Sequence, residues 1–222
     1  MSKDKFKIIS FILPNFLSIV AISLSLVSFR YTVLKDKWDS QERISVTNSS
    51  FSYDETLSYD MVGPFRGQGL LDGINYTIIL SNNSKQKVSL ISYEIFQTGS
   101  GLRFQYSNMV RAVKDQKDQE ILFPLSIDAG DSVALTFEIN TAIQTSVNML
   151  LLSKYGVSGE IPLEEIQMYL GENGYDIFGN NVDYTLYGDG SYKIKSEAPL
   201  FPEYDLEILT SKGNVIKASL SQ

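Results

Sequence analysis

Three acidic residues near the middle of the chain have side chains that suit a bound cation. Asp128, Asp131 and Glu138 lie within a short stretch, and carboxylate oxygens are ligands that Ca²⁺ prefers. However, a Gly-Asp pair before a strand is also ordinary turn chemistry, and the ligand order of an EF-hand loop is absent. The turn is therefore the main interpretation, and the sequence predicts neither a bound metal nor a cofactor.

A second acidic group is of the kind that glycoside hydrolases use. Glu164 and Glu165, combined with Asp176 or Asp183, would supply the two carboxyl groups that flank a glycosidic bond in such enzymes. Consecutive glutamates directly after Pro162 are also typical of the first turn of a helix, where negative charge is stabilising. We take the helix start as the main interpretation and a carboxylate-dependent glycan hydrolase as the alternative.

The composition closes most other catalytic routes. The chain of 222 residues contains neither cysteine nor histidine. This excludes disulfides, Cys-ligated zinc, His-ligated metals, and the Ser-His-Asp and Cys-His catalytic arrangements. We therefore expect a protein that is not an enzyme.

The best candidate for recognition is the stretch 175–192, YDIFGNNVDYTLYGDGSY. It mixes Tyr, Gly, Asn and Asp, as antibody binding loops do to combine rigid aromatic rings with adaptable hydrogen bonds. The alternative is a pair of ordinary β-turns whose tyrosines pack half-buried on strands. The predicted recognition surface consists of Tyr175, Tyr184, Tyr187, Asp189 and Tyr192.

Charge is distributed unevenly along the chain. Residues 1–43 carry seven Lys or Arg and four Asp or Glu, whereas residues 44–222 carry 12 and 22. The second segment therefore has a net charge of −10, within a total of −7. Phosphate groups repel such an acidic domain, so we do not expect nucleic acid among its partners.

An uncharged apolar run occupies residues 8–29, IISFILPNFLSIVAISLSLVSF. A helix of its 22 residues is about 33 Å long, enough to cross a hydrocarbon core of about 30 Å. The sequence thus predicts a transmembrane helix in the lipid bilayer, after a basic tail at 1–7 and before a juxtamembrane connector at 30–43. A cleavable signal peptide is the competing interpretation, but the apolar run continues past the small residues Ala21 and Ser23.

The flanks and one face of this run add two expectations. Three lysines and the terminal amine precede it, and the amine tips the charge balance toward a cytoplasmic N-terminus and an extracytoplasmic domain. Ser18, Ala21, Ser25 and Ser28 recur at spacings of three and four, which places small residues on one stripe. Such stripes let helices approach closely in lipid, so we expect a partner helix or a homo-oligomer there. Alternatively, each serine bonds to a carbonyl one turn earlier.

Residues 44–222 show the alternation and turn chemistry of one β-rich domain. A strand begins at 44–48, and a glycine-containing loop follows up to Gly73. Alternation predicts strands at 74–80 and 88–97, joined as a hairpin by an Asn-Asn-Ser turn, with Ile91, Tyr93 and Ile95 on one face. The run 132–139 is the clearest half-buried strand. Turn signals predict two further hairpins, 184–187 with 192–195 and 206–209 with 215–220.

A helical insertion is expected near 141–170. Thr141 is a possible cap, and apolar residues recur at helical spacing up to Tyr155. The segment 163–170 fits a helix and a strand equally well.

Two segments, INYTIILSNNSKQKVSLISYEIF and FPLSIDAGDSVALTFEI, resemble the paired strands of bacterial membrane-anchored immunoglobulin-like or fibronectin-III-like proteins. The chain departs from antibody-type domains because it has no Cys pair and because its one tryptophan, Trp38, lies outside the domain. The resemblance implies a mainly β fold, an antiparallel β-sandwich with one or two short helices, and no assigned activity. We therefore expect a binding or assembly module for a protein or glycan partner, or an envelope stress or integrity protein.

Overall fold

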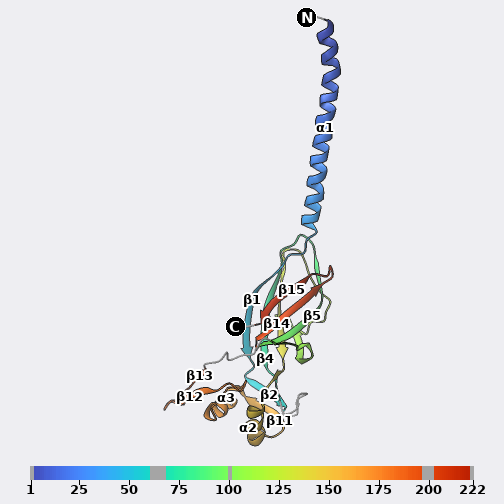
Figure 1. Ribbon diagram of the computed structural model, residues 1–222. Helices are drawn as coiled ribbons and strands as arrows, with labels where there is room; N and C mark the ends of the chain where they lie inside the picture. The colour runs from blue at the N-terminus through green and yellow to red at the C-terminus, as the bar shows by residue number, and fades with distance from the viewer. Residues whose placement is uncertain (1–2, 61–68, 100–101, 197–202, 221–222) are drawn as a thin grey trace.

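A computed structural model of the chain describes residues 3–60, 69–99, 102–196 and 203–220, without side chains at 3–19, 48, 49, 99 and 102. The fold is mainly β with antiparallel sheets, which is consistent with the predicted β-sandwich. A long helix, α1 (Lys3–Asp39), precedes the strands and extends away from them at one end of the molecule (Figure 1).

Two antiparallel sheets form the body of the domain. The first has the order β1-β4-β9-β7, which are Ile44–Tyr53, Ile74–Asn82, Ser132–Ile139 and Val110–Lys114. The second has the order β15-β14-β5-β6, which are Val215–Leu220, Glu203–Thr210, Val88–Gly99 and Leu102–Gln105. The short strand β8 (Leu125–Ile127) also pairs with β5, and a 3-10 turn, η1 (Ser107–Met109), leads into β7.

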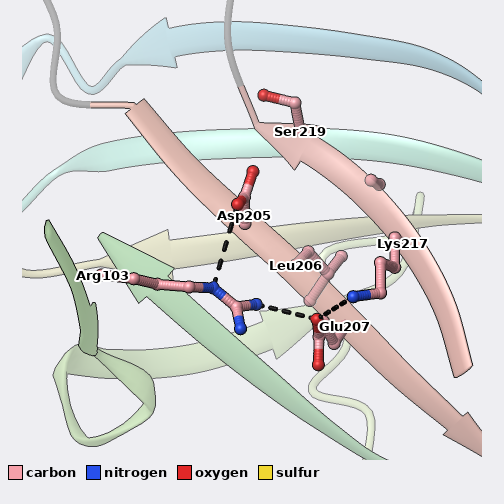
Figure 2. A pocket seen from close by; sticks show the side chains of 7 residues that line it. Arg103, Asp205, Leu206, Glu207, Lys217 and Ser219 are labelled. Atoms are coloured by element: carbon pink, nitrogen blue, oxygen red, sulfur yellow. Dashed lines mark hydrogen bonds and ion pairs between the residues drawn. The ribbon is translucent and has the colours of Figure 1, made fainter. Parts of the chain in front are cut away.

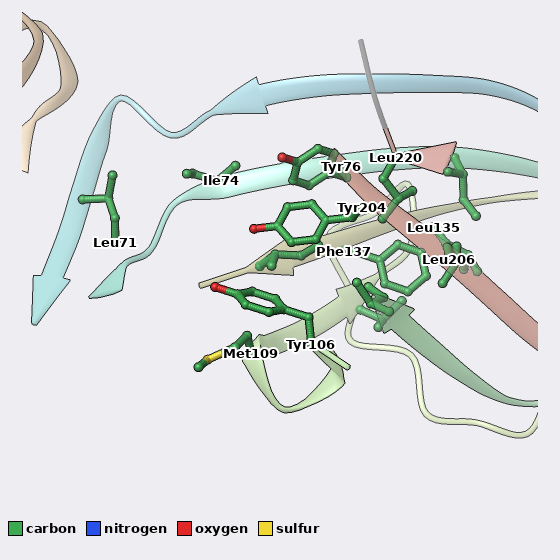
Figure 3. Close-up of a cluster of buried hydrophobic side chains, with 14 of the residues drawn as sticks. Leu71, Ile74, Tyr76, Tyr106, Met109, Leu135, Phe137, Tyr204, Leu206 and Leu220 are labelled. Atoms are coloured by element: carbon green, nitrogen blue, oxygen red, sulfur yellow. The ribbon is translucent and has the colours of Figure 1, made fainter. Parts of the chain in front are cut away.

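The core lies between these two sheets (Figure 3). Every second residue of β4 is buried, as the alternation predicted: Ile74, Tyr76, Ile78 and Leu80. From the other sheet, the Tyr204 ring packs edge-on against the Tyr76 ring, with 5.4 Å between their centroids. The inner faces of both sheets therefore form a single apolar layer.

The predicted hairpin between 74–80 and 88–97 is wrong. β4 pairs with β1 and β9, whereas β5 pairs with β14, β6 and β8. The connection between β4 and β5 crosses from one sheet to the other. The side chain of Asn82 stabilises this crossing by hydrogen bonds. The Asn82 amide donates to the carbonyls of Gln86, Ile127 and Asp128 at 2.8, 2.9 and 3.1 Å, and its oxygen accepts from the Ser84 N–H at 3.0 Å.

The buried face of β5 changes along the strand. The register between β5 and β14 shifts between Leu90 and Ser92, which makes Ile91 an extra residue in a bulge. Leu90 and Ile95 are buried, whereas Ile91 is 42% exposed. The predicted placement of Ile91 on one face with Tyr93 and Ile95 is therefore wrong, because the bulge shifts the alternation by one residue.

A smaller α/β layer lies at the end of the domain away from α1 (Figure 1). It contains the sheet β10-β3-β2-β11, which are Thr141–Ala142, Leu70–Leu71, Thr56–Asp60 and Ser158–Pro162. It also contains the helices α2 (Thr145–Tyr155) and α3 (Leu163–Glu172), and the hairpin of β12 (Val182–Leu186) and β13 (Tyr192–Ser196). β2 and β3 lie in the stretch predicted as a loop. The alternation of β2 covers only five residues and β3 has only two, so neither stood out beside the longer runs.

The helical insertion is confirmed, with different boundaries. α2 begins at Thr145, and Thr141 belongs to β10 instead of capping the helix. The residue at the helix N-terminus is Gln144, which makes no side-chain capping bond. The ambiguous segment 163–170 is helical, with Glu164 and Glu165 in its first turn. Tertiary packing resolves what the short sequence pattern left open.

The end of α1 is tied to the domain by two turns. From the β4–β5 connection, the Gln86 amide donates to the Asp39 carbonyl at 3.0 Å. From the β14–β15 turn, the Asn214 amide donates to the Glu42 carboxylate at 2.8 Å. The end of α1 and the residues after it therefore make hydrogen bonds with two separate turns of the domain.

Among the residues that the structure describes, no helix is both long enough and apolar enough to cross a membrane. The structure thus gives no support to the predicted transmembrane segment at 8–29. Part of that segment, residues 8–19, lies outside the residues whose side chains are described.

Candidate recognition surface at the β12–β13 hairpin

The hairpin of β12 and β13 forms a two-stranded sheet of its own. Its turn is closed by the Tyr187 N–H, which donates to the Ser191 carbonyl at 2.8 Å. Gly190 has a φ of +88°, a conformation that glycine adopts without strain. Asp189 accepts hydrogen bonds from the N–H and the hydroxyl of Ser191, and these hold the pKa of its carboxyl below the ordinary value. Asp189 therefore shapes the turn.

Tyr184 and Tyr192 attach the hairpin to α3. Their rings stack at 6.0 Å with an interplanar angle of 29°, and the Tyr192 hydroxyl donates to the Gln167 side chain at 2.7 Å. The Tyr184 ring lies so close to Gly171 that a Cβ there would come within 2.4 Å of it. These two tyrosines thus match the alternative in which the aromatic rings pack against neighbouring elements.

The other two predicted tyrosines differ in exposure. Tyr175 is half-buried against the core, and its N–H donates to the Leu170 carbonyl at 3.0 Å. Tyr187, at the tip of β12, is 47% exposed, and the adjacent Leu186 is 51% exposed. Of the predicted recognition residues, Tyr187 is the aromatic ring best placed to meet a partner. Leu186, which the sequence interpretation missed, is exposed beside it.

Asp176 precedes the hairpin in the chain and accepts hydrogen bonds from its own loop. It is buried, and its oxygens accept from the Phe178 N–H, the Asn180 N–H and the Asn180 amide at 2.9, 2.8 and 2.7 Å. Burial raises the pKa of its carboxyl, and these hydrogen bonds oppose that shift. The acceptor positions of Asp176 are therefore occupied by the loop that it organises.

The remaining predicted carboxylates lie on different elements. Glu164 and Glu165 occupy the first turn of α3, as the helix interpretation predicted, and Glu165 lies 4.0 Å from the Lys154 ammonium. Asp183 is exposed on β12. This distribution favours local structural roles for these acids.

The acidic residues of the predicted cation site are not gathered around one point. Asp128 pairs with Lys87 at 3.5 Å in the turn before β9, whereas Glu138 lies near the far end of that strand. Glu138 is bound by Arg111 and Lys114, with its Oε2 atom 3.1 Å from the Arg111 Nε atom. Within the described parts of the chain, no group of three or more acidic side chains is arranged to hold a metal ion.

A second exposed feature, which the sequence interpretation missed, is an ionic cluster on the outer face of the second sheet (Figure 2). It lines a shallow pocket of about 440 Å³. Glu207 lies 2.8 Å from both the Arg103 guanidinium and the Lys217 ammonium, and both lower the pKa of its carboxyl. Asp205 lies 4.0 Å from Arg103. The alternating acids of β14 were the available signal, and their ion pairs with Arg103 and Lys217 form a cross-strand network.

The predicted helix-packing stripe lies on α1. Ala21, Ser25 and Ser28 are exposed, and Ser18 lies outside the residues whose side chains are described. The Ser28 carbonyl accepts a hydrogen bond from the Thr32 hydroxyl at 3.0 Å. Back-bonding to the helix therefore occurs next to the stripe.

No protein-family model matches this chain, and neither does any curated protein sequence.

Proposed function

We propose that the protein is a single-pass, membrane-anchored β-sandwich of the immunoglobulin-like kind that acts as a non-catalytic binding or assembly module. Its partner would be a protein or a glycan. The observation that carries the proposal is the separation of two exposed apolar regions. One lies along α1, and the other lies on α2 and the β12–β13 hairpin, at the end of the domain away from α1 (Figure 1).

The apolar side chains of α1 support the anchor. Between Val20 and Phe29 they point outward on all sides, and five large ones are 60–68% exposed: Ile22, Leu24, Leu26, Val27 and Phe29. A helix that is apolar all round needs a cover, and lipid suits an uncharged run of 22 residues. The small residues Ser18, Ala21, Ser25 and Ser28 would then pack against another helix within the bilayer.

The far end of the domain supports the binding role. Leu186 and Tyr187 are exposed on the hairpin, and Met149, Leu152 and Val157 are exposed on and after α2. Exposed apolar and aromatic residues are typical of a protein-binding or ligand-binding surface, and the elements that carry these lie at the end of the domain away from α1 (Figure 1). A domain that is anchored through α1 at one end is suited to present its opposite end to a partner.

Changing Tyr187 to alanine is expected to reduce partner recovery about tenfold or more, as for a hot-spot aromatic residue. Because its side chain is 47% exposed, the midpoint of thermal unfolding should shift by no more than about 2 °C. Crosslinked pulldown from native membranes, with glycan-array binding in parallel, measures the first quantity, and circular dichroism measures the second.

The matched control for this change is Leu122→Ala. Leu122 is 79% exposed in the connection between β7 and β8, away from the hairpin in the chain. It should leave both recovery and unfolding unchanged. Equal losses of recovery from the two variants, or a large fall in melting temperature for Tyr187→Ala, would show that the hairpin tip is not part of the binding surface.

The full chain is expected to sediment with membranes and to resist carbonate extraction, whereas a variant without residues 8–29 should stay in the aqueous fraction. A phosphatase fused after Gln222 should be active if the domain is extracytoplasmic, and a fluorescent-protein fusion should then be dark. Recovery of the intact chain from the aqueous fraction without detergent would refute the anchor.

A further inference from the structure

The described part of α1 carries a heptad pattern of exposed apolar residues. Alternating spacings of four and three connect Val20, Leu24, Val27, Tyr31, Leu34 and Trp38. All six are exposed, the last five by 61–68%. In an α-helix this spacing keeps side chains on one narrow strip, which is the a/d seam of a coiled coil.

A lipid bilayer around the uncharged run would not cover the outer half of this seam. Trp38 follows Phe29, the last residue of the uncharged run, by nine positions and therefore lies about 13 Å further along the helix. The headgroup layer adds only about 5–8 Å on each side of the hydrocarbon core. A bilayer that ends at Phe29 would cover Tyr31 but leave Trp38 in water and Leu34 at its margin.

The rest of the outer helix is polar apart from one position. Beyond Phe29, Val33 is the single large apolar residue of α1 that is exposed off the seam. The Arg43 guanidinium lies 4.0 Å from the centre of the Trp38 ring, yet Trp38 remains 61% exposed. The domain therefore supports the base of the seam and leaves its outer surface uncovered.

The charges beside the seam are segregated by sign. With Leu24, Tyr31 and Trp38 at position a of each heptad, Arg30 and Lys37 occupy position g and Lys35 occupies position e, directly beside the apolar strip: Arg30, Lys35 and Lys37 are all exposed. The two acids of this segment, Asp36 and Asp39, fall at positions f and b, away from it. Within the described residues, no carboxylate forms an ion pair with the three basic side chains.

We propose that residues 20–38 of α1 bind a partner helix that has apolar a and d residues and acidic e and g residues. A second copy of this chain fits poorly. In a parallel pair, Arg30 of one helix would face Lys35 of the other, and symmetry would repeat the repulsion. A helix with glutamates at these positions replaces repulsion with attraction. Because residues 30–38 lie past the uncharged run, the seam exists whether or not α1 enters a membrane.

Trp38 is the only tryptophan in the chain, so its fluorescence reports directly on the seam. The probe is a tryptophan-free helical peptide of about three heptads, with Leu at a and d and Glu at e and g. Titrated into the full-length protein in detergent micelles, it should shift the Trp38 emission to shorter wavelength in a saturable way. The same peptide with Lys at positions e and g should bind with an affinity at least about tenfold lower.

Two exposed substitutions provide a matched comparison. Leu34→Asn places an amide in the seam and should abolish the saturable shift, whereas Val33→Asn, one residue away but off the seam, should preserve it. Reversal of Arg30, Lys35 and Lys37 to Glu should exchange the preference between the two peptides. Since these side chains are exposed, all variants should unfold at the wild-type temperature.

Three results would overturn the proposal. The first is equal binding of the acidic and basic peptides, and the second is an equal loss from Leu34→Asn and Val33→Asn. The third is a Trp38 emission that is already shifted without peptide in a protein that sediments as a dimer, which would assign the seam to a second copy. A micelle that covers the uncharged run 8–29 would still leave Leu34 and Trp38, which lie past that run, open to the peptide.

Discussion

Replacing Asn82 by alanine is expected to lower the free energy of unfolding by about 3–5 kcal/mol. Asn82 is fully buried, and its amide donates to the carbonyls of Gln86, Ile127 and Asp128. Alanine would leave these carbonyls without that donor where the chain crosses from one sheet to the other. Each unpaired buried polar group costs about 1–3 kcal/mol, and small domains are stable by only about 5–15 kcal/mol.

Thermal unfolding followed by circular dichroism measures this loss. For a chain of this size, 1 kcal/mol corresponds to about 2–4 °C, so the midpoint should fall by about 6–20 °C. Asn83→Ala is the matched control, because Asn83 is exposed and its amide donates to the Ser45 hydroxyl at 2.8 Å. It should cost less than about 1 kcal/mol. Similar losses in the two variants would show that Asn82 does not hold the crossing.

The role of Asn82 also explains why the β4–β5 hairpin was predicted wrongly. An Asn-Asn-Ser sequence between two alternating strands has the composition of a tight hairpin turn, and nothing local distinguishes that turn from a crossing between sheets. Whether this segment is a hairpin turn or a crossing depends on which strands pair with β4, and these are far away in the sequence. Asn75 of β4, for example, pairs with Glu138 of β9. Such register depends on residues far apart in the chain, which single-sequence patterns do not report.

Strands that alternate apolar and polar residues could be located well from the sequence. β9 was predicted with its boundaries, and both C-terminal hairpins were found, because alternation and Gly-containing turns identify strands and hairpins. The prediction that β9 is half-buried is wrong, since Ala134 and Glu138 on its other face are buried as well. The bulge at Ile91 breaks the same rule by inserting one residue. Alternation therefore identifies a strand reliably but not a change of face within it.

The candidate site could be located in the sequence but not oriented. The turn signal at 188–190 correctly predicted a hairpin with a tight turn within the stretch 175–192. Tyr184 and Tyr192 face α3 because Gly171 leaves room for a ring there, and that complementarity lies outside the stretch itself. Tyr187 and Leu186 are exposed because no element among the described residues covers the tip of the hairpin.

Raising the pH above 10 is expected to unfold the domain steeply. Tyr76, Tyr106 and Tyr204 are at most 5% exposed and lie together in the core (Figure 3), with ring centroids 5.4 and 5.2 Å from that of Tyr204. Burial raises the pKa of each hydroxyl above its ordinary value of 10.0. The folded state therefore keeps these hydroxyls protonated at a pH where the unfolded chain ionises them.

The sign of the effect follows from proton binding. Above pH 10 the unfolded chain binds fewer protons than the folded one, so stability is complete below that pH and falls as the pH rises. Each such tyrosine costs about 1.4 kcal/mol per pH unit, and three of them cost about 4 kcal/mol per unit. That slope is comparable with the whole stability of a domain, so two pH units should suffice for unfolding.

Tyrosinate absorbance and circular dichroism, recorded together against pH, test this expectation. Absorbance of the buried tyrosines should rise only as the sheet signal disappears. Tyr204→Phe should reduce the pH dependence above 10, because one buried ionisable hydroxyl is gone. Leu122→Ala, at an exposed position, should leave the slope unchanged. A tyrosinate signal that develops fully near pH 10 while the sheets stay intact would mean that the core hydroxyls reach solvent in the folded state.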